Sequence, residues 1–375
     1  MSSILSLGLA SPLGLGLTHS MSGWIAGSSG IGENDRWNTS GFPRADAGLV
    51  PGFVPRKHLP DRKAVKLMSR ESQLAVFAAV EAGGGTNLPA SAGLPATEVG
   101  AFAAAGYEVS NLSDSEGMLA ASRDPEDPSR ILLHRLFGEG RDVYNPLSPL
   151  KILPNMPLFH AGLALGLEGP HLCLGSSPAA GLAALGEASE SIARGECRAA
   201  LVLGSDAQVE EFRAQLLVEA GVTPSLAPAE GAAALILGPT NSDTKSSVPS
   251  PVIVAWDAAQ EPFEAYGRCS DAGATRAALY SRVLEQSGPV DLCLADLWGD
   301  PAHDVPELFA LGRQAAIEGA PQTSRNRLGW LGAAQGLTDV AIAAELVRRG
   351  RAQRVLITAS GLTGDVAAVL IEGRT

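Results

Sequence analysis

The sequence LCLGSSPAAGLAALGEASESIARGECRAALVLGSDA, residues 172–207, contains the pattern that decides the fold. A short apolar run at 172–175 precedes an Ala-rich segment with helical periodicity at 179–194, and a second apolar run follows at 199–203. Apolar runs without alternation are typical of strands covered on both faces. The stretch therefore predicts a strand–helix–strand unit of an α/β protein with parallel pairing.

The same unit recurs at an offset of 155 residues. Ala179, Gly181, Leu182, Ala188, Glu190, Arg194, Gly195, Leu201 and Ser205 correspond to Ala334, Gly336, Leu337, Ala343, Glu345, Arg349, Gly350, Leu356 and Ser360. Gly195 and Gly350 suit the left-handed position that ends a helix. The register extends over helix, cap, strand and loop, so we predict a duplicated core.

Similar elements follow along the rest of the chain. Further strands are expected at 4–9, 99–103, 232–237, 252–255, 292–295, 355–358 and 366–371, and further helices at 70–82, 274–286 and 338–349. The polar, Pro-bearing stretch 238–251 predicts a boundary between an N-terminal half, 1–238, and a C-terminal half, 251–375. A segment of weaker periodicity at about 106–156 predicts an insertion that caps the first half.

Composition restricts the class of protein. The chain has 375 residues and a net charge of −12, which disfavours nucleic acid as a partner. No apolar run reaches the roughly 18 residues that span a bilayer, and the N-terminal stretch lacks the basic start of a signal peptide. Four widely spaced cysteines indicate free thiols in a reducing cytoplasm. We expect neither a metal nor a cofactor.

One basic segment goes against the acidic total. The stretch PRKHLPDRKAVKLMSR, residues 55–70, contains a single acid. Its cations are Arg56, Lys57, Arg62, Lys63, Lys66 and Arg70. A solvated helix face explains them, and so does a docking patch for an acidic partner.

Several stretches resemble the ketosynthases of fatty-acid and polyketide synthesis, over nearly the whole chain. They are GLASPLGLGLTHSMSGWIAGSSGI (8–31), MSRESQLAVFAAVEA (68–82), the long segment 145–207 and EGAAALILG (230–238). The resemblance implies a thiolase fold, five-layered αβαβα and built from two similar halves, in a protein that is usually dimeric.

The resemblance also locates the family's catalytic positions. A condensing ketosynthase needs a cysteine thiolate at a strand-to-helix turn and two histidines. Here Pro178 stands at the cysteine position, and Asp296 and Trp330 stand at the histidine positions. Arg325 falls near the family's lysine, and the Phe-bearing glycine loop that gates the active site has become SGLTGD at 360–365. No catalytic position is predicted to be intact.

Silent members of the family that this chain resembles are the chain-length factors of type II polyketide synthases. The resemblance implies a heterodimer with an active ketosynthase, an acyl tunnel shaped by this chain, and acyl carrier protein docked on the basic segment. Tunnel candidates are Tyr107, Val109, Leu112 and Met118. Chain-length factors often carry glutamine at the cysteine position, so Pro178 also fits a divergent branch, such as aryl polyene or other nonactinomycete type II systems; the resemblance thus implies an aryl polyene or an aromatic product. The alternatives are a self-sufficient acyltransferase that uses Ser176 or Ser177, and a non-catalytic scaffold.

Overall fold

The computed structural model describes residues 1–106, 112–175, 177–219, 225–240, 249–264, 268–285 and 287–374. Their main feature is a mixed sheet in the order β12-β13-β14-β9-β1-β8-β7-β5-β6. The strands are β1 (Ser2–Ser11), β5 (Val99–Ala105), β6 (His171–Gly175), β7 (Ala199–Ala207), β8 (Glu230–Pro239), β9 (Ser250–Gln260), β12 (Leu292–Leu294), β13 (Arg354–Ser360) and β14 (Asp365–Arg374). All of the strands expected from the sequence are present.

The sheet divides into two parts that touch at β1. Strand β1 pairs with β8 over most of its length, whereas it pairs with β9 only at Ser2 and Ser3. In the first part, β6 and β7 both run parallel to β5. They are connected through α10 (Pro178–Ala193), which confirms the strand–helix–strand unit predicted for 172–207.

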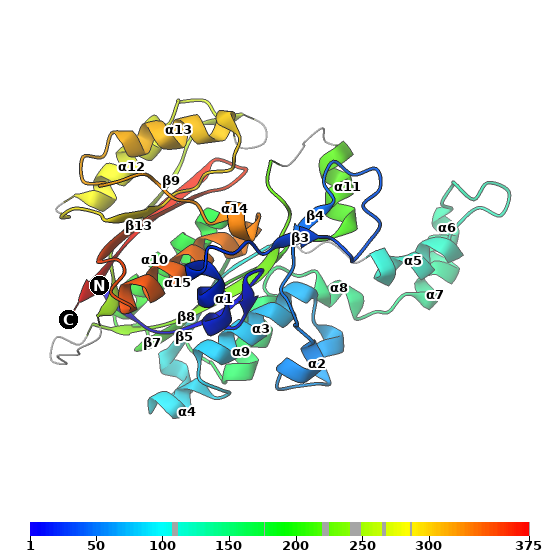
Figure 1. Cartoon of the computed structure of the whole chain (residues 1–375). Helices are drawn as coiled ribbons and strands as arrows, with labels where there is room; N and C mark the ends of the chain where they lie inside the picture. The colour runs from blue at the N-terminus through cyan, green and yellow to red at the C-terminus, as the bar shows by residue number, and fades with distance from the viewer. Residues whose placement is uncertain are drawn as a thin grey trace.

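Helices separate and cover the two parts of the sheet (Figure 1). Helices α3 (Arg70–Ala82) and α9 (Met156–Leu165) lie on one outer face, and α12 (Ala274–Leu284) and α13 (Pro301–Gly312) lie on the other. Between the two parts lie α10 and α15 (Gln335–Arg348). Three apolar core clusters fill the spaces between these layers, so the arrangement is αβαβα.

The two central helices pack head to head because small residues let them approach. A Cβ at Gly336 would overlap the carbonyl oxygen of Pro178 at the head of α10. Gly195 and Gly350, which follow the two helices, both have positive φ, at 73° and 64°. Both corresponding glycines therefore occupy the left-handed position expected from the repeat. The division into halves at 1–238 and 251–375 remains a prediction.

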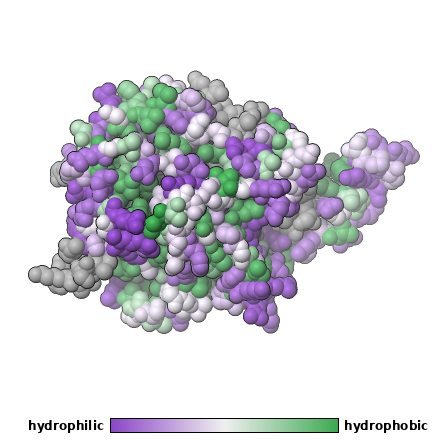
Figure 2. All heavy atoms as spheres, in the orientation of Figure 1, coloured by the Kyte–Doolittle hydropathy of each residue, from purple (hydrophilic) through white to green (hydrophobic). Residues whose placement is uncertain are grey.

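The predicted insertion at about 106–156 includes an arm that extends from the body (Figure 1). It contains α5 (Leu112–Ala121), α6 (Leu133–Arg135), α7 (Arg141–Val143) and, closer to the body, α8 (Ser148–Lys151). Phe137 and Leu133 are about 70% exposed there, at 71% and 68%. Apolar atoms gather along the lower side of this arm in Figure 2. Among the described residues, no helix is both long and apolar enough to cross a membrane.

Candidate functional site

A cavity of about 690 Å³ lies at the head of α10. It is bounded by the ends of β6 and β7, by helix α11 (Glu211–Glu219), by β9, and by the loops that carry Trp298, Trp330 and 361–365. Pro178 and Trp330 line it, as do Leu362 and Thr363 of the predicted gate. Asp296 does not line the cavity, because it lies behind Trp298, whose indole nitrogen donates to it at 3.1 Å.

The head of α10 contains an internal carboxylate. Pro178 is the first helical residue, so it offers neither an N–H nor a nucleophile there. The Ser177 hydroxyl accepts from the Ala180 N–H at 3.0 Å and donates to Asp365. The positive end of a helix favours a neighbouring anion. In this chain, Asp365 is the anion that lies there.

Ser177 is therefore part of the helix cap. Serine attacks a carbonyl only when a neighbouring base takes its proton, and a carboxylate is a weak base for that purpose. Neither histidine nor cysteine is among the residues that line the described cavity. The other serine proposed as a nucleophile, Ser176, lies outside the described residues.

Asp296 forms a buried ion pair. It follows β12 and is 1% exposed, and its carboxylate accepts from the Arg325 guanidinium, the Ser360 hydroxyl and the Trp298 indole. Arg325, on the short helix α14 (Arg325–Leu328), is equally buried. Burial raises the pKa of Asp296, but the charges of Arg325 and His303 outweigh burial and hold that pKa below its usual value. Asp296, which the sequence analysis predicts to stand at a histidine position of the family, thus has a structural role.

His303 completes this buried cluster. Its ring stacks on Trp298 with centroids 4.1 Å apart, and its Nε2 lies 2.8 Å from the Ser360 hydroxyl. Its Nδ1 lies 3.5 Å from Asp304, so the order serine–histidine–aspartate is that of a hydrolase triad. However, Ser360 donates its proton to Asp296, and Nε2–H therefore donates to Ser360. Ser360 is also 1% exposed, so His303 has a structural role.

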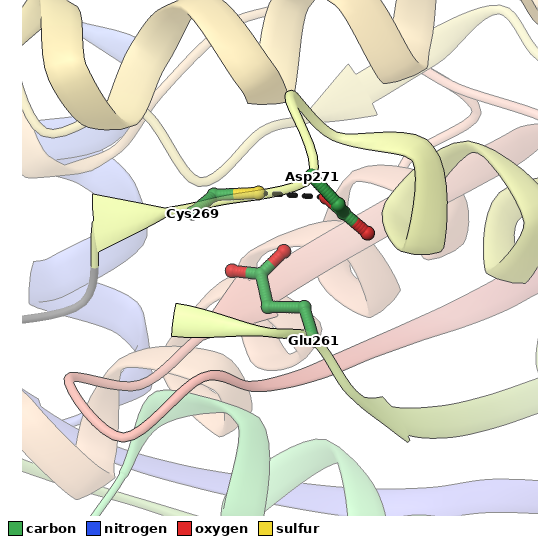
Figure 3. Close-up of side chains that lie close together, drawn as sticks. All are labelled: Glu261, Cys269 and Asp271. Carbon is green, nitrogen blue, oxygen red and sulfur yellow. Dashed lines mark hydrogen bonds between the residues drawn. The ribbon is translucent and has the colours of Figure 1, made fainter. Parts of the chain in front are cut away.

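A second cluster of possible ligand atoms lies beside the two short strands β10 (Phe263–Glu264) and β11 (Arg268–Cys269) (Figure 3). The ligand atoms of Glu261, Cys269 and Asp271 all lie within 4.8 Å of one another. Both oxygens of Glu261 already accept from Arg276, at 2.7 and 2.8 Å, and the Cys269 thiol donates to Asp271 at 2.9 Å. Burial raises the pKa of Cys269 to about 11. A metal would have to displace Arg276 and deprotonate Cys269, so the cluster does not fit one.

The basic segment divides into two groups. Five of its cations are exposed and line one depression of about 600 Å³ near α2 (Pro55–His58), and no ion pair joins them to another described residue. They are Arg56, Lys57, Arg62, Lys63 and Lys66. The sixth, Arg70, instead binds the buried Glu230 through two nitrogens, at 2.6 and 2.9 Å, and covers the Phe53 ring. Arg70 thus has a structural partner that the other five lack.

The tunnel candidates do not meet at the cavity in the described part of the chain. Tyr107 and Val109 lie outside the described residues, and so does the side chain of Leu112. Met118 belongs to α5 in the arm and is not among the residues that line the cavity. Sequence reasoning missed Arg213, on α11, and Asp365, whose importance depends on contacts with residues far along the chain.

Comparison with known proteins agrees with this architecture. The family model described as the N-terminal domain of beta-ketoacyl synthases matches residues 3–239. Two solved structures align with 100% of this chain, and the alignment includes 99% of each of their chains. One is the ishigamide ketosynthase/chain length factor, with TM-score 0.75 and 19% identity. The other is AntDE:AntF, a type II PKS acyl-carrier protein in complex with its ketosynthase, with TM-score 0.78 and 16% identity. These structures confirm the predicted thiolase fold.

A curated relative, 3-oxoacyl-[acyl-carrier-protein] synthase 2 of Synechocystis sp., is 27% identical over 206 residues. That match covers 55% of this chain and 45% of the relative. The chain spans less than half the length of the curated relatives that it matches.

Proposed function

Because the chain belongs to the beta-ketoacyl synthase family, we propose that it is a non-condensing subunit of the chain-length-factor type, which pairs with an active ketosynthase. The observation that carries this proposal is Pro178 at the head of α10. Condensation in the family needs a thiolate at that turn, and proline cannot form one.

The surroundings of Pro178 support the same conclusion. A thiolate would gain stability from the positive end of α10, but Asp365 already lies there through Ser177. Asp296 and Trp330, at the family's histidine positions, cannot exchange protons as imidazoles do. Such losses are compatible with a subunit whose task depends on shape and packing.

In this proposal the partner supplies the cysteine and both histidines, and this chain completes the interface and the acyl tunnel. One structural neighbour is a ketosynthase/chain length factor pair, and another contains a ketosynthase with its acyl-carrier protein. By analogy, the product belongs to a type II polyketide pathway, possible classes being aryl polyenes and aromatics. The tunnel role of residues 107, 109, 112 and 118 stays part of the proposal.

Coexpression tests the subunit role directly. This chain should copurify with a cysteine-bearing ketosynthase from the same type II pathway, and an acyl thioester should then load only the partner. Intact mass spectrometry of both chains measures the loading. An acyl adduct on this chain, which an acyltransferase using Ser176 or Ser177 would give, overturns the proposal. A chain that stays unpaired and unloaded fits the scaffold alternative instead.

Carrier-protein docking is the finer part of the proposal. The five exposed cations of the depression near α2 would attract an acidic carrier protein. Arg62→Glu with Lys63→Glu should weaken carrier-protein binding roughly tenfold or more at low salt, because each reversal replaces attraction with repulsion. A matched control is Arg130→Glu with Arg351→Glu, two exposed cations outside the depression. Equal binding of both double variants would count against the patch.

A further inference from the structure

We propose that the cavity at the head of α10 binds a free conjugated carboxylic acid, without a covalent bond to the chain. The proposal does not depend on the subunit role, since every residue that it uses belongs to this chain. It rests on the walls of the cavity, on one arginine, and on the position of one carboxylate. The volume of about 690 Å³ lies within the usual size range of small-molecule sites.

The walls favour a flat and apolar ligand. On one side are the indoles of Trp298 and Trp330, with centroids 6.0 Å apart and planes inclined by 38°. Another part of the wall is made of alanines from α10 and β9, namely Ala179, Ala180, Ala183, Ala258 and Ala259. Aromatic faces stack well on planar π-systems, and alanine side chains leave room beside them. A conjugated chain or ring uses both features.

Arg213 provides the anchor for an anion. Its Nη1 donates to Asp206 at 3.2 Å, and this is its one hydrogen bond to another described residue. Asp206 is also compensated by the Ala333 N–H at 2.9 Å and by Gln208 at 2.6 Å. In the described part of the chain, no acceptor binds the Nε–H and Nη2–H groups of Arg213. Guanidinium groups bind a carboxylate with two parallel hydrogen bonds, so these groups suit the acid that we propose.

One further group orients the ligand. Asp365 lines the cavity at the head of α10, where its negative charge repels a second carboxylate. The ligand's carboxylate is therefore directed toward Arg213.

The described residues of the wall offer no activated nucleophile, so the binding that we propose is non-covalent. Pro178 has no reactive atom, and the Ser177 hydroxyl is held between Ala180 and Asp365. A free carboxylic acid has no thioester bond to cleave, so its binding involves no leaving group. The site thus fits a released acid rather than a thioester.

The probe for the test is parinaric acid, a straight-chain conjugated tetraene acid whose absorption overlaps tryptophan emission. The full chain should bind it saturably at a single site, with quenching of tryptophan emission. Methyl parinarate, which lacks the negative charge, should bind at least tenfold more weakly. Arg213→Gln should weaken binding of the acid at least tenfold and leave the ester unchanged, whereas the exposed control Arg130→Gln changes neither.

A second variant, Ala183→Trp, should abolish binding of both probes because the larger side chain fills the part of the cavity that Ala183 lines. Circular dichroism checks that each variant is folded. The proposal is overturned if the acid binds wild type no better than its ester, or if it binds Ala183→Trp as well as wild type. The first of these outcomes needs no variant, and neither outcome bears on pairing with a ketosynthase.

Discussion

Replacing Asp296 with alanine should destabilise the protein by about 3–5 kcal/mol, because it leaves Arg325 buried without a counter-charge. Both side chains are nearly inaccessible, at 1% and 2% exposure. The substitution also removes the acceptor for the Trp298 indole and the Ser360 hydroxyl. At about 2.1 cal/mol/K per residue, unfolding entropy for a chain of 375 residues converts this loss to a melting temperature lower by about 4–6 °C.

A double-mutant cycle separates the ion pair from general damage to the core. Arg325→Met alone should cost a similar amount, because it leaves Asp296 buried and charged. Asp296→Ala combined with Arg325→Met should cost less than the sum of the two by about 3 kcal/mol, which is the upper part of the usual range for contacting groups. Urea unfolding followed by far-ultraviolet circular dichroism measures all four proteins. A single substitution that costs less than about 1 kcal/mol, or additive costs, would refute the buried ion pair.

Two further predictions concern titration. In Pro178→Cys, the Asp365 carboxylate at the head of α10 should keep the pH midpoint for alkylation of the new thiol at or above about 8.5. Adding Asp365→Asn to this variant should lower the midpoint. A midpoint near neutrality in Pro178→Cys alone contradicts this reasoning. Burial raises the pKa of Asp339 to about 6. Its native state keeps a proton that the unfolded chain loses above about pH 4, so this group's contribution to stability falls between pH 4 and 6. Between pH 4 and 6, the free energy of unfolding of Asp339→Asn relative to that of wild type should rise by up to about 3 kcal/mol, and above pH 6 this difference should stay constant. A difference in urea unfolding that does not vary with pH argues against the raised pKa.

Much of the fold could be predicted because its signals are local. Apolar runs, helical periodicity and the Arg-Gly helix ends depend on neighbouring residues, and they recur at a fixed offset. The contacts that decide the site are not local. Ser177 meets Asp365 across 188 positions, and Arg70 meets Glu230 across 160. A pattern in one sequence cannot show which carboxylate reaches a given helix head or a given arginine. The sequence analysis therefore groups Arg70 with five other cations, although Arg70 alone of these binds Glu230.

The same long-range contacts explain why, in this proposal, a single substitution would not restore condensing activity. A histidine at position 296 would put an imidazole against the buried Arg325, where it could not remain protonated and could not replace the carboxylate that Arg325 requires. A cysteine at position 178 would meet Asp365 at the helix end that should stabilise its thiolate. Asp296 and Asp365 both have partners that depend on them, namely Arg325 and Ser177. In this proposal, recovery of condensation would therefore need Asp296, Arg325, Trp330 and Asp365 to change together with Pro178.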